Sequence, residues 1–438
     1  MNSFILKTEI QLEKARDRYK NFLSEASSRS FWQVHFENHN FAYQPEKFSW
    51  EYWREIPVFT KEDFLKIGLE KRIADIGVGG AEKPARGFAF RITSGTTRQT
   101  EPVLTIRGAG PPYKIPENEW RTIWMYNPCT LALRGVLINN ACNERERTTR
   151  YQTLALDPYR LDESSRQALL EFHADNISAF PYAMSRFASF FAESDAKELP
   201  QLAKAYIGGD FLSDKEGRLI RSIFKKIELE ISYGLAEFGN IGRPCRFLAG
   251  RYGRNAYHPR QSYLVELMDL DKNGIGEIVA TNPVSPDFAL IRYRTGDIGR
   301  AIREKCECGM QWTLILEGRK GFDIVKCGGA MVVRQELERV IGWLKDDIAD
   351  WRAEAREILQ GNRIMGELAV FVKPTPSFAR KNINHASYLA EAIGGKLYVT
   401  PTETLKNLAD SHRFMPLCIE LVKDFPVDQK LVRLKKIN

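Results

Sequence analysis

The sequence predicts an α/β protein with a large, multi-layer N-terminal domain and a small α/β C-terminal domain. Between about residues 88 and 320, short apolar runs alternate with helical segments, as in a core built on a parallel sheet. A second compositional unit begins near Gly318 and is long enough for a separate domain. The length of 438 residues also favours more than one domain. We therefore predict domains at residues 1–317 and 318–438.

The first 50 residues are predicted to be largely helical, because their apolar residues recur at helical spacing. These residues are Ile5, Leu12, Ala15, Tyr19, Phe22 and Leu23. A short extended run at 56–59 then precedes a helix for which Thr60 is a suitable N-cap. Glu62 and Asp63 fall in its first turn, where the helix dipole favours negative charge.

The alternating region is expected to supply the parallel sheet. Its apolar runs and helical segments follow in the order 87–92, 135–138, 164–172, 205–207, 213–224 and 229–231. Ser213 and Glu216 have the spacing of a capping box. Residues 263–268 and 276–281 predict two further strands, and residues 271–274 (Asp-Lys-Asn-Gly) between them have the chemistry of a hairpin turn.

The C-terminal domain is predicted to contain a long helical segment at residues 335–360. Residues 367–372 and 417–422 predict strands, with a helix near 386–393 between them. These elements are enough for a small α/β domain.

Composition excludes several classes of protein. Hydrophobic residues at 43% and charged residues at 27% are ordinary globular usage, unlike that of disordered or collagen-like chains. No stretch approaches the roughly 18 apolar residues of a membrane span. The first 20 residues lack the continuous apolar core of a signal peptide. Seven cysteines form no dense framework, so we expect a cytoplasmic protein with reduced thiols and no membrane partner.

The net charge of +8 allows two interpretations, a nucleic-acid binder or an enzyme with a mildly basic surface suited to phosphorylated ligands. The basic residues are spread along the chain, and no basic stripe is interleaved with aromatic residues. This distribution favours the enzyme, and we expect no nucleic-acid partner.

Two loops have residue types suited to nucleotide chemistry. Thr93, Ser94, Gly95, Thr96 and Thr97 offer N–H and hydroxyl donors that can cradle phosphate oxygens, although a plain turn is the alternative. The pattern is not that of a P-loop. In the second loop, which follows an apolar run, an aromatic-Gly pair precedes a carboxylate. Here the aromatic ring can stack on a base and the carboxylate can hold Mg²⁺, with core packing plus a cap as the alternative. The residues concerned are Tyr233, Gly234 and Glu237.

A third motif is the turn Arg292-Tyr293-Arg294-Thr295-Gly296-Asp297 after a predicted strand. Its aspartate can accept hydrogen bonds from ribose hydroxyls. Gly318-Arg319 follows, and a guanidinium group suits a phosphate. A surface turn and a solvated arginine are the alternatives.

The order of these motifs resembles that of the adenylate-forming superfamily, which includes acyl-CoA synthetases, peptide-synthetase adenylation domains and luciferases. Within it the chain is most similar to the phenylacetate-CoA ligase branch. Residues 56–63 resemble an early segment of that branch, and residues 292–297 match its RYRTGD. Residues 306–309 (Cys-Glu-Cys-Gly) stand where it often has CxCG. The resemblance spans about residues 50–438 and implies that the C-terminal domain is mobile.

The resemblance implies roles for the nucleotide-binding residues. Residues 93–97 would hold the ATP phosphates, Tyr233 would stack on adenine, and Glu237 would bind Mg²⁺. Asp297 would bind the ribose, and Arg319 would contact ribose or phosphate. Residues 207–210 resemble a Gly-Ala-Glu turn beside adenine and the acyl pocket, which places Gly209 and Asp210 there. The pocket walls would be Ala179, Phe180, Pro181, Tyr182, Tyr233 and Gly234.

The late catalytic lysine of the family has a candidate in Lys430, since residues 428–430 (Asp-Gln-Lys) resemble a Glu-Gly-Lys segment. The alternative is a solvated basic tail, because Lys435 and Lys436 lie close by. With Glu237 and Arg319, Lys430 completes the expected catalytic set.

The sequence departs from the family pattern in two places. The phosphate loop normally continues Gly-Lys-Pro but here runs Arg98-Gln99-Thr100, so the loop lysine is missing. The segment after Gly318-Arg319 lacks the usual early hinge residue, and Gly321 is a candidate for the flexible position.

Cys245, His258, Cys306 and Cys308 form a candidate Cys₃His zinc set, and similar residues bind zinc in some members of the resembling branch. Four protein ligands would make the ion structural. Scattered buried thiols are the alternative. Cys327 lies beside Gly328-Gly329 without a histidine partner in sequence, and we expect it to be merely a small, tolerated residue rather than a nucleophile.

The resemblance implies an ATP- and Mg²⁺-dependent ligase. It would convert a small carboxylic acid, aryl or arylalkyl, to an acyl-adenylate with release of pyrophosphate, and then transfer the acyl group to CoA as a thioester. One alternative passes the acyl group to a carrier protein, an amine or another acceptor. A second is a degenerate, non-catalytic nucleotide-binding protein, favoured by the missing loop lysine. A dimer is compatible with the sequence.

Overall fold

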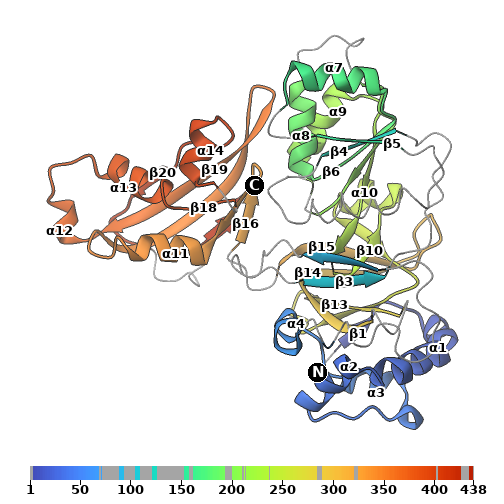
Figure 1. Cartoon of the computed structure of the whole chain (residues 1–438). Coiled ribbons are helices and arrows are strands. Elements are labelled where there is room, and N and C mark those ends of the chain that lie inside the picture. Colours follow the sequence, from blue (N-terminus) through green and yellow to red (C-terminus); the bar gives the residue numbers. More distant parts are fainter. Residues whose placement is uncertain are drawn as a thin grey trace.

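In the computed structural model, the described residues surround two main hydrophobic cores (Figure 1). These residues are 3–68, 71, 88–92, 104–108, 121–125, 152–156, 161–192, 200–209, 212, 214–235, 237–283, 289–319, 324–400, 403–425 and 434–437. The larger core contains buried residues from Ile5 to Leu316. The second contains residues from Val325 to Leu434. The cores therefore change over between Leu316 and Val325, while the strand that begins at Trp312 continues to Arg319 in a sheet of the larger unit. The boundary at 317/318 stays a proposal.

The N-terminal region is largely helical, as predicted. Its helices are α1 (Glu9–Ser27), α2 (Ser30–Asn38), the 3₁₀-helix η1 (Pro45–Lys47), α3 (Trp50–Glu55) and α4 (Lys61–Ile67). The predicted N-cap Thr60 closes a capping box with Asp63, which satisfies two backbone donors at the start of α4. The assignment of Ile5 to a helix is wrong, because strand β1 (Ser3–Ile5) pairs with a strand far along the chain.

The predicted parallel sheet is present. Its described strands lie in the order β5 (Gln152–Ala155), β4 (Arg121–Met125), β6 (Asn176–Ala179), β7 (Lys204–Ile207) and β8 (Glu228–Ile231), and every neighbouring pair is parallel. The helices α7 (Glu163–Phe172), α8 (Pro181–Phe190) and α9 (Asp214–Ile223) connect them. The predicted run 135–138 and the capping residue Ser213 lie outside the described residues. The carboxyl ends of β6, β7 and β8 meet at one edge of this sheet.

A second, antiparallel sheet has eight described strands in the order β1-β12-β13-β14-β15-β11-β10-β9. The bounds are β9 (Tyr233–Leu235), β10 (Gly239–Arg243), β11 (Ala256–Pro259), β12 (Leu264–Met268), β13 (Ile275–Asn282), β14 (Leu290–Arg303) and β15 (Trp312–Arg319), with helix α10 (Arg246–Tyr252) between β10 and β11. The hairpin predicted at residues 263–281 is confirmed by β12 and β13. A separate pair joins β2 (Phe88–Ile92), predicted at 87–92, and β3 (Leu104–Gly108).

The C-terminal core combines two small sheets and four helices among the described residues. Strand β16 (Ile324–Cys327) pairs with β17 (Ala330–Val333), and a four-stranded sheet has the order β20-β19-β18-β21. The remaining bounds are α11 (Arg334–Gly342), β18 (Ile348–Gln360), β19 (Arg363–Pro374), α12 (Pro376–Ala379), α13 (His385–Gly394), α14 (Leu405–Asp410), β20 (Cys418–Leu421) and β21 (Leu434–Lys436). The predicted strands near 367–372 and 417–422 and the helix near 386–393 are confirmed.

The predicted long helix at 335–360 is wrong. Only α11 is helical, and Ile348–Gln360 forms the strand β18, which pairs with β19 over its whole length. Trp351, Ala353 and Ala355 are buried at alternate positions, which is the periodicity of a strand. Pairing with β19 therefore overrides the helical preference of alanine, glutamate and arginine in this segment.

The two cores touch where α8 and α9 meet the β18–β19 hairpin and the turn after β16. Ser189 Oγ donates to the carbonyl of Asn362, and Lys215 Nζ donates to that of Glu357 at 3.0 Å. In Figure 1 the C-terminal core, in orange and red, lies beside α8. These contacts fix one arrangement of the two cores.

Candidate functional site

The carboxyl edge of the parallel sheet brings three predicted segments together. Gly208 N donates to Ala179 O after β6, and Ser232 N donates to Ile207 O after β7. Gly209 has a φ of +81°, and a Cβ there would lie 2.3 Å from Cε1 of Phe180. Glycine is therefore required at 209 both by its backbone conformation and by the ring beside it. Asp210, like Thr93–Thr97 and Lys430, lies outside the described residues.

Tyr233 and Asp297, predicted to bind adenine and ribose, lie against each other. The Tyr233 hydroxyl donates to Asp297 Oδ2 at 3.0 Å, and both residues are buried. The ring of Tyr233 also packs against Tyr257, with 5.9 Å between the ring centroids. The two predicted residues therefore form one preorganised unit, and sequence spacing gave no sign of this bond.

Glu237, the predicted Mg²⁺ ligand, lies in the connection between β9 and β10. Its Oε1 accepts a hydrogen bond from the Tyr293 hydroxyl at 2.6 Å. Gly234, earlier in the same motif, has no room for a side chain, because a Cβ would lie 2.5 Å from the carbonyl oxygen of Gly239. The close approach of β9 and β10 therefore fixes the connection that carries Glu237.

Asp297 lies inside the long strand β14 rather than in the predicted turn after a strand. The register between β13 and β14 shifts between Glu277 and Val279, which leaves Thr295, Gly296 and Asp297 in a bulge between Arg294 and Ile298. Gly296 has a φ of +75°. On the other side of β14, Asp297 is paired with Arg319 of β15. The backbone positions of the RYRTGD and Gly-Arg motifs therefore meet; the side chain of Arg319 is outside the described part.

Arg292 anchors this strand to the N-terminal helices. Its fully buried guanidinium group pairs with Glu266 at 3.0 Å and donates to the carbonyls of Arg54 and Ile56. Glu266 also accepts from the indole N–H of Trp53. Arg292 has a φ of +47°, a region that arginine rarely adopts. These contacts hold the strand in place next to Tyr293.

Two residues at this edge were not predicted. Lys326 of β16 donates to the carbonyl of Gly209 at 3.4 Å. Gly329, in the turn after β16, lies so close to Tyr182 that a Cβ would be 2.2 Å from its Cε1. The Gly328-Gly329 pair was the sequence signal for a close approach, but it did not identify the partner. Cys327 beside it is buried in the second core.

Cys245, His258, Cys306 and Cys308 converge, as the zinc hypothesis requires. Their candidate ligand atoms all lie within 4.8 Å of one another. The Cys245 and Cys306 sulfur atoms are 3.8 Å apart, and Cys308 Sγ lies 3.1 Å from His258 Nε2. His258 Nδ1 lies 2.7 Å from the carbonyl oxygen of Trp312 and donates a hydrogen bond to it. The other ring nitrogen, Nε2, therefore faces the thiols. The residues therefore fit a tetrahedral zinc ion.

The close packing of these thiols and of the imidazole shifts the pKa values of Cys306, Cys308 and His258. Desolvation would raise the pKa of Cys306, but hydrogen bonds from Cys308 and Cys245 outweigh it and lower that pKa. Burial, with the neighbouring Cys306 and Cys245, raises the pKa of Cys308 to about 11. Burial lowers the pKa of His258, so its imidazole is neutral near pH 7. A bound dication would offset the repulsion between several thiolates.

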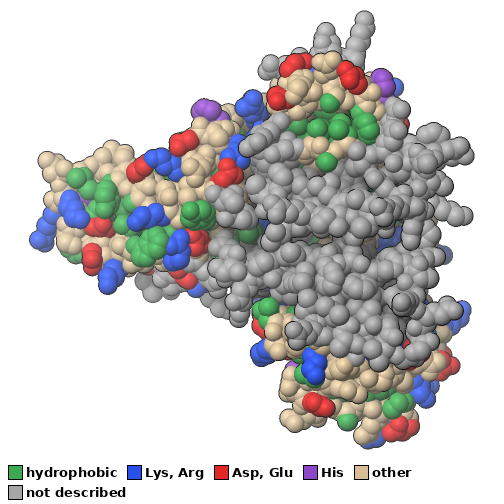
Figure 2. All heavy atoms as spheres, in the orientation of Figure 1, with side chains coloured by type: hydrophobic (Ala, Val, Ile, Leu, Met, Phe, Trp, Pro, Cys, Tyr) green, Lys and Arg blue, Asp and Glu red, His purple; other side chains and the backbone are tan. Residues whose placement is uncertain are grey.

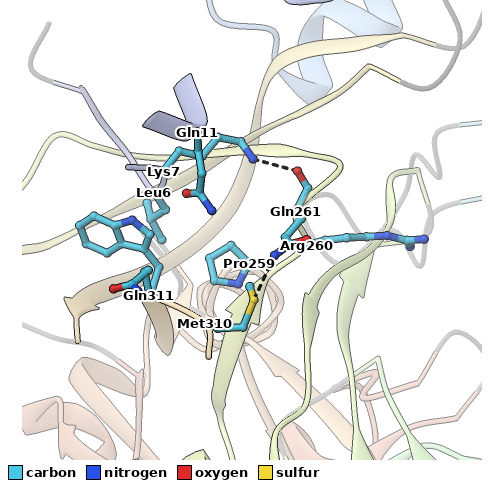
Figure 3. A pocket seen from close by; sticks show the side chains of 9 residues that line it. Leu6, Lys7, Gln11, Pro259, Arg260, Gln261, Met310 and Gln311 are labelled. Atoms are coloured by element: carbon cyan, nitrogen blue, oxygen red, sulfur yellow. Dashed lines mark hydrogen bonds between the residues drawn. The ribbon is translucent and has the colours of Figure 1, made fainter. Parts of the chain in front are cut away.

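A small pocket lies beside this cluster, between the N-terminal segment and the loop before β15 (Figure 3). Its volume is about 20 Å³, which is room for roughly one water molecule. Lys7 donates to the carbonyl of Gln261 there, and burial, followed by the charge of Arg18, lowers the pKa of Lys7 to about 8. The pocket is too small for a nucleotide and is not part of the candidate site.

Surface charge bears on the expectation about a nucleic-acid partner, and the helices of the described residues bear on the expectation about a membrane partner. On the face shown in Figure 2, Lys and Arg side chains of the C-terminal lobe are mixed with Asp and Glu. Among the described helices, none has the length and apolar character needed to span a bilayer.

Comparison with known proteins gives matches at the level of structure. No protein-family model and no curated protein matches the sequence. A solved structure of 2-hydroxyisobutyryl-CoA ligase, with 2-HIB-AMP and CoA in the thioesterification state, matches with a TM-score of 0.62 and 15% identity, covering 99% of this chain and 91% of that chain.

The fold is similar to that of 2-hydroxyisobutyryl-CoA ligase. Its open conformation with 2-HIB-AMP and CoA matches with a TM-score of 0.53 at 14% identity, covering 97% of this chain and 91% of the ligase. Its postadenylation state with 2-HIB-AMP also gives a TM-score of 0.53, at 15% identity and coverage of 99% and 91%. The predicted fold class, a large α/β unit followed by a small one, is therefore confirmed. Of these three states of 2-hydroxyisobutyryl-CoA ligase, the thioesterification state matches best.

Proposed function

We propose that this chain is an adenylating ligase that activates a carboxylic acid with ATP and passes the acyl group to CoA. The observation that carries the proposal is the convergence of three sequence motifs around Tyr233 and Asp297. Tyr233 binds Asp297, Glu237 binds Tyr293, and Asp297 pairs with Arg319. The similarity to a CoA ligase fold over nearly the whole chain supports the same conclusion.

In the proposed first step, the substrate carboxylate attacks the α-phosphorus of ATP, and the bond to pyrophosphate breaks. The acyl-adenylate and pyrophosphate are the products. Asp297 accepts hydrogen bonds from the ribose hydroxyls, and Tyr233 lies beside the adenine. Residues 93–97 donate to the phosphate oxygens. Most of the rate enhancement would come from such preorganised charges and donors.

Glu237 would hold Mg²⁺, an ion that neutralises charge on the phosphate oxygens when bound. The hydrogen bond from Tyr293 orients the carboxylate before the ion arrives. A carboxylate held in place in this way loses less conformational entropy on binding the metal.

In the second step, CoA attacks the acyl carbonyl and AMP leaves. We propose that the C-terminal domain presents different residues in the two steps. Lys430 serves the first step, and Lys326 lies at the Gly209 edge in the arrangement described here. The higher TM-score against the thioesterification state supports an assignment of this arrangement to the second step.

The acid is proposed to be aryl or arylalkyl, as in the phenylacetate-CoA ligase branch that the RYRTGD and CxCG motifs resemble. An apolar, aromatic pocket suits such acids. Phe180, which contacts Gly209, is the described residue best placed to line it.

Acid-dependent exchange of labelled pyrophosphate into ATP tests the proposal with a panel of aryl, fatty and amino acids. Exchange with one acid class supports the enzyme and identifies its substrate. Thioester formation after addition of CoA then separates CoA transfer from transfer to an amine or carrier protein. Absence of exchange with every acid, in protein that binds ATP, would instead favour the degenerate nucleotide-binding protein.

The Cys₃His cluster is proposed to hold a structural zinc ion. The cluster joins the loop before β15 to the N-cap of α10 and to β11. All four ligands come from the protein, which leaves no open position for chemistry.

A further inference from the structure

A second group of metal-ligating side chains lies in the N-terminal helical region, away from the cysteine cluster. His35 is on α2, His39 caps the C-terminal end of that helix, and Asp63 is in the first turn of α4. Their candidate ligand atoms all lie within 4.8 Å of one another. The two imidazole rings are 4.5 Å apart between centroids.

His35 is the residue of this group whose ring nitrogens, Nδ1 and Nε2, are buried without a hydrogen-bond partner among the described residues. Its side chain is fully buried. The rings of Trp32 and Phe59 pack against it at 5.5 and 5.2 Å. A buried polar group without a partner is costly and rare in folded proteins.

A neutral imidazole has one nitrogen with an available lone pair, so the buried ring of His35 can offer one ligand atom to an ion.

The other two side chains are held in place by their own hydrogen bonds. His39 Nδ1 lies 2.9 Å from the carbonyl of His35, so it acts as a donor and leaves Nε2 for an ion. Asp63 Oδ2 accepts from the backbone N–H and the hydroxyl of Thr60, both at 2.8 Å. Such outer contacts orient ligands in known metal sites. His39 is exposed and Asp63 half-buried, which gives an ion access from solvent.

We propose that His35, His39 and Asp63 bind a divalent transition-metal ion of the Zn²⁺ or Co²⁺ type. Two imidazoles and one carboxylate suit these ions, and water can complete the coordination. The bound ion would cross-link the end of α2 to the start of α4. This proposal does not depend on the proposed ligase activity or on the cysteine cluster.

Cobalt titration of the purified full-length protein tests the site, after one equivalent of Zn²⁺ per chain has been added for the cysteine cluster and unbound zinc has been removed. We expect one further equivalent of Co²⁺ with visible ligand-field bands and no thiolate-to-cobalt charge transfer, because this site has no sulfur. His39→Ala and Asp63→Asn should each weaken the binding at least about tenfold. His39 is exposed, and asparagine at 63 keeps an acceptor for the helix cap, so both variants should fold.

His412→Asn is the matched control, because it removes another exposed histidine far along the chain and should bind Co²⁺ like the unmodified protein. Circular dichroism checks that each variant is folded. If a variant does not fold, the cobalt spectrum of the unmodified protein decides the question by itself. The proposal is overturned if no sulfur-free Co²⁺ site forms, or if folded His39→Ala and Asp63→Asn bind as tightly as the control.

Discussion

Glu237 owes its position to Tyr293, since the 2.6 Å bond between them sets the direction of the carboxylate. We predict that Glu237→Gln leaves the fold intact, because glutamine keeps an oxygen that accepts this bond. Adenylate formation should fall at least ~100-fold, the scale for loss of one charge-stabilising group. Pyrophosphate exchange measures the effect, and the exposed Glu420→Gln serves as the control. Unchanged exchange in Glu237→Gln would remove Glu237 from the metal site.

The second prediction about a single residue concerns Lys430. Its ammonium group would offset charge at the carboxylate and α-phosphate during the first step. Lys430→Ala should slow adenylation by roughly two orders of magnitude and spare thioester formation from a supplied acyl-adenylate. Lys435→Ala and Lys436→Ala are controls that should do little. Equal loss in both half-reactions would point to a folding defect instead.

Sequence patterns selected residues that contact one another in the fold, but they did not predict which of them are partners. The spacing within Tyr233–Glu237 and Arg292–Asp297 picked out side chains that meet in the fold. It could not show that Tyr233 binds Asp297, 64 positions away, or that Tyr293 binds Glu237, 56 positions away. Those bonds depend on how β9 and β14, which are not neighbours in the eight-stranded sheet, approach each other, and local spacing carries no record of that.

At the scale of elements, the cysteine cluster joins three segments through side chains alone. We predict about one zinc ion per chain, measured by elemental analysis of protein purified without chelators. Cys306→Ser with Cys308→Ser should lower the melting temperature strongly, because metal-binding energy is also folding energy. Cys418→Ser, at an exposed position outside the cluster, is the control. Metal-free protein with an unchanged melting temperature in the double variant would disprove the structural zinc.

The elements themselves were predictable where the pattern was local. The cap at Thr60 and the turn at 271–274 depend on a few neighbouring residues, and both were correct. The prediction for residues 335–360 failed because strand formation there depends on β19, which supplies the hydrogen-bonding partners of β18. The sequence signal for a strand was the alternation of Trp351, Ala353 and Ala355, which are buried, with charged residues. This signal is weak, because two of the three residues are alanines, which differ little in hydrophobicity from their neighbours.

For the whole molecule, the contact between Gly329 and Tyr182 decides whether the two cores can adopt this arrangement. A Cβ at 329 would lie 2.2 Å from the tyrosine ring. We predict that Gly329→Ala slows thioester formation from a supplied acyl-adenylate by about tenfold or more, which corresponds to ~1.4 kcal/mol. Adenylation should be spared, because in the proposed mechanism it uses a different arrangement of the two cores.

Gly361→Ala is the matched control for this prediction. Both glycines have positive φ, +78° at 329 and +58° at 361, so alanine is strained at both positions. Only at 329 would the new methyl group meet another part of the protein. Equal effects of the two substitutions on thioester formation would show that backbone strain, rather than the contact between the cores, is responsible.

The two-part architecture was predictable because each core has its own continuous stretch of sequence. The order of the eight-stranded sheet was not, because β1 and β9 lie at its two edges while β12 to β15 lie inside it. Alternating apolar residues show that a strand has a buried face, but they do not select its neighbour.

The pairing of β1 with β12 also has a consequence for biosynthesis. Ser3 pairs with Met268, so β1 needs a partner that is made more than 260 residues later. At about 5–20 residues per second, this delay is roughly 15–50 s of translation. Helix α1 can form during that time from its own Thr8–Gln11 capping box. A nascent chain that stalls before residue 264 therefore carries formed N-terminal helices and a strand whose partner has not yet been made.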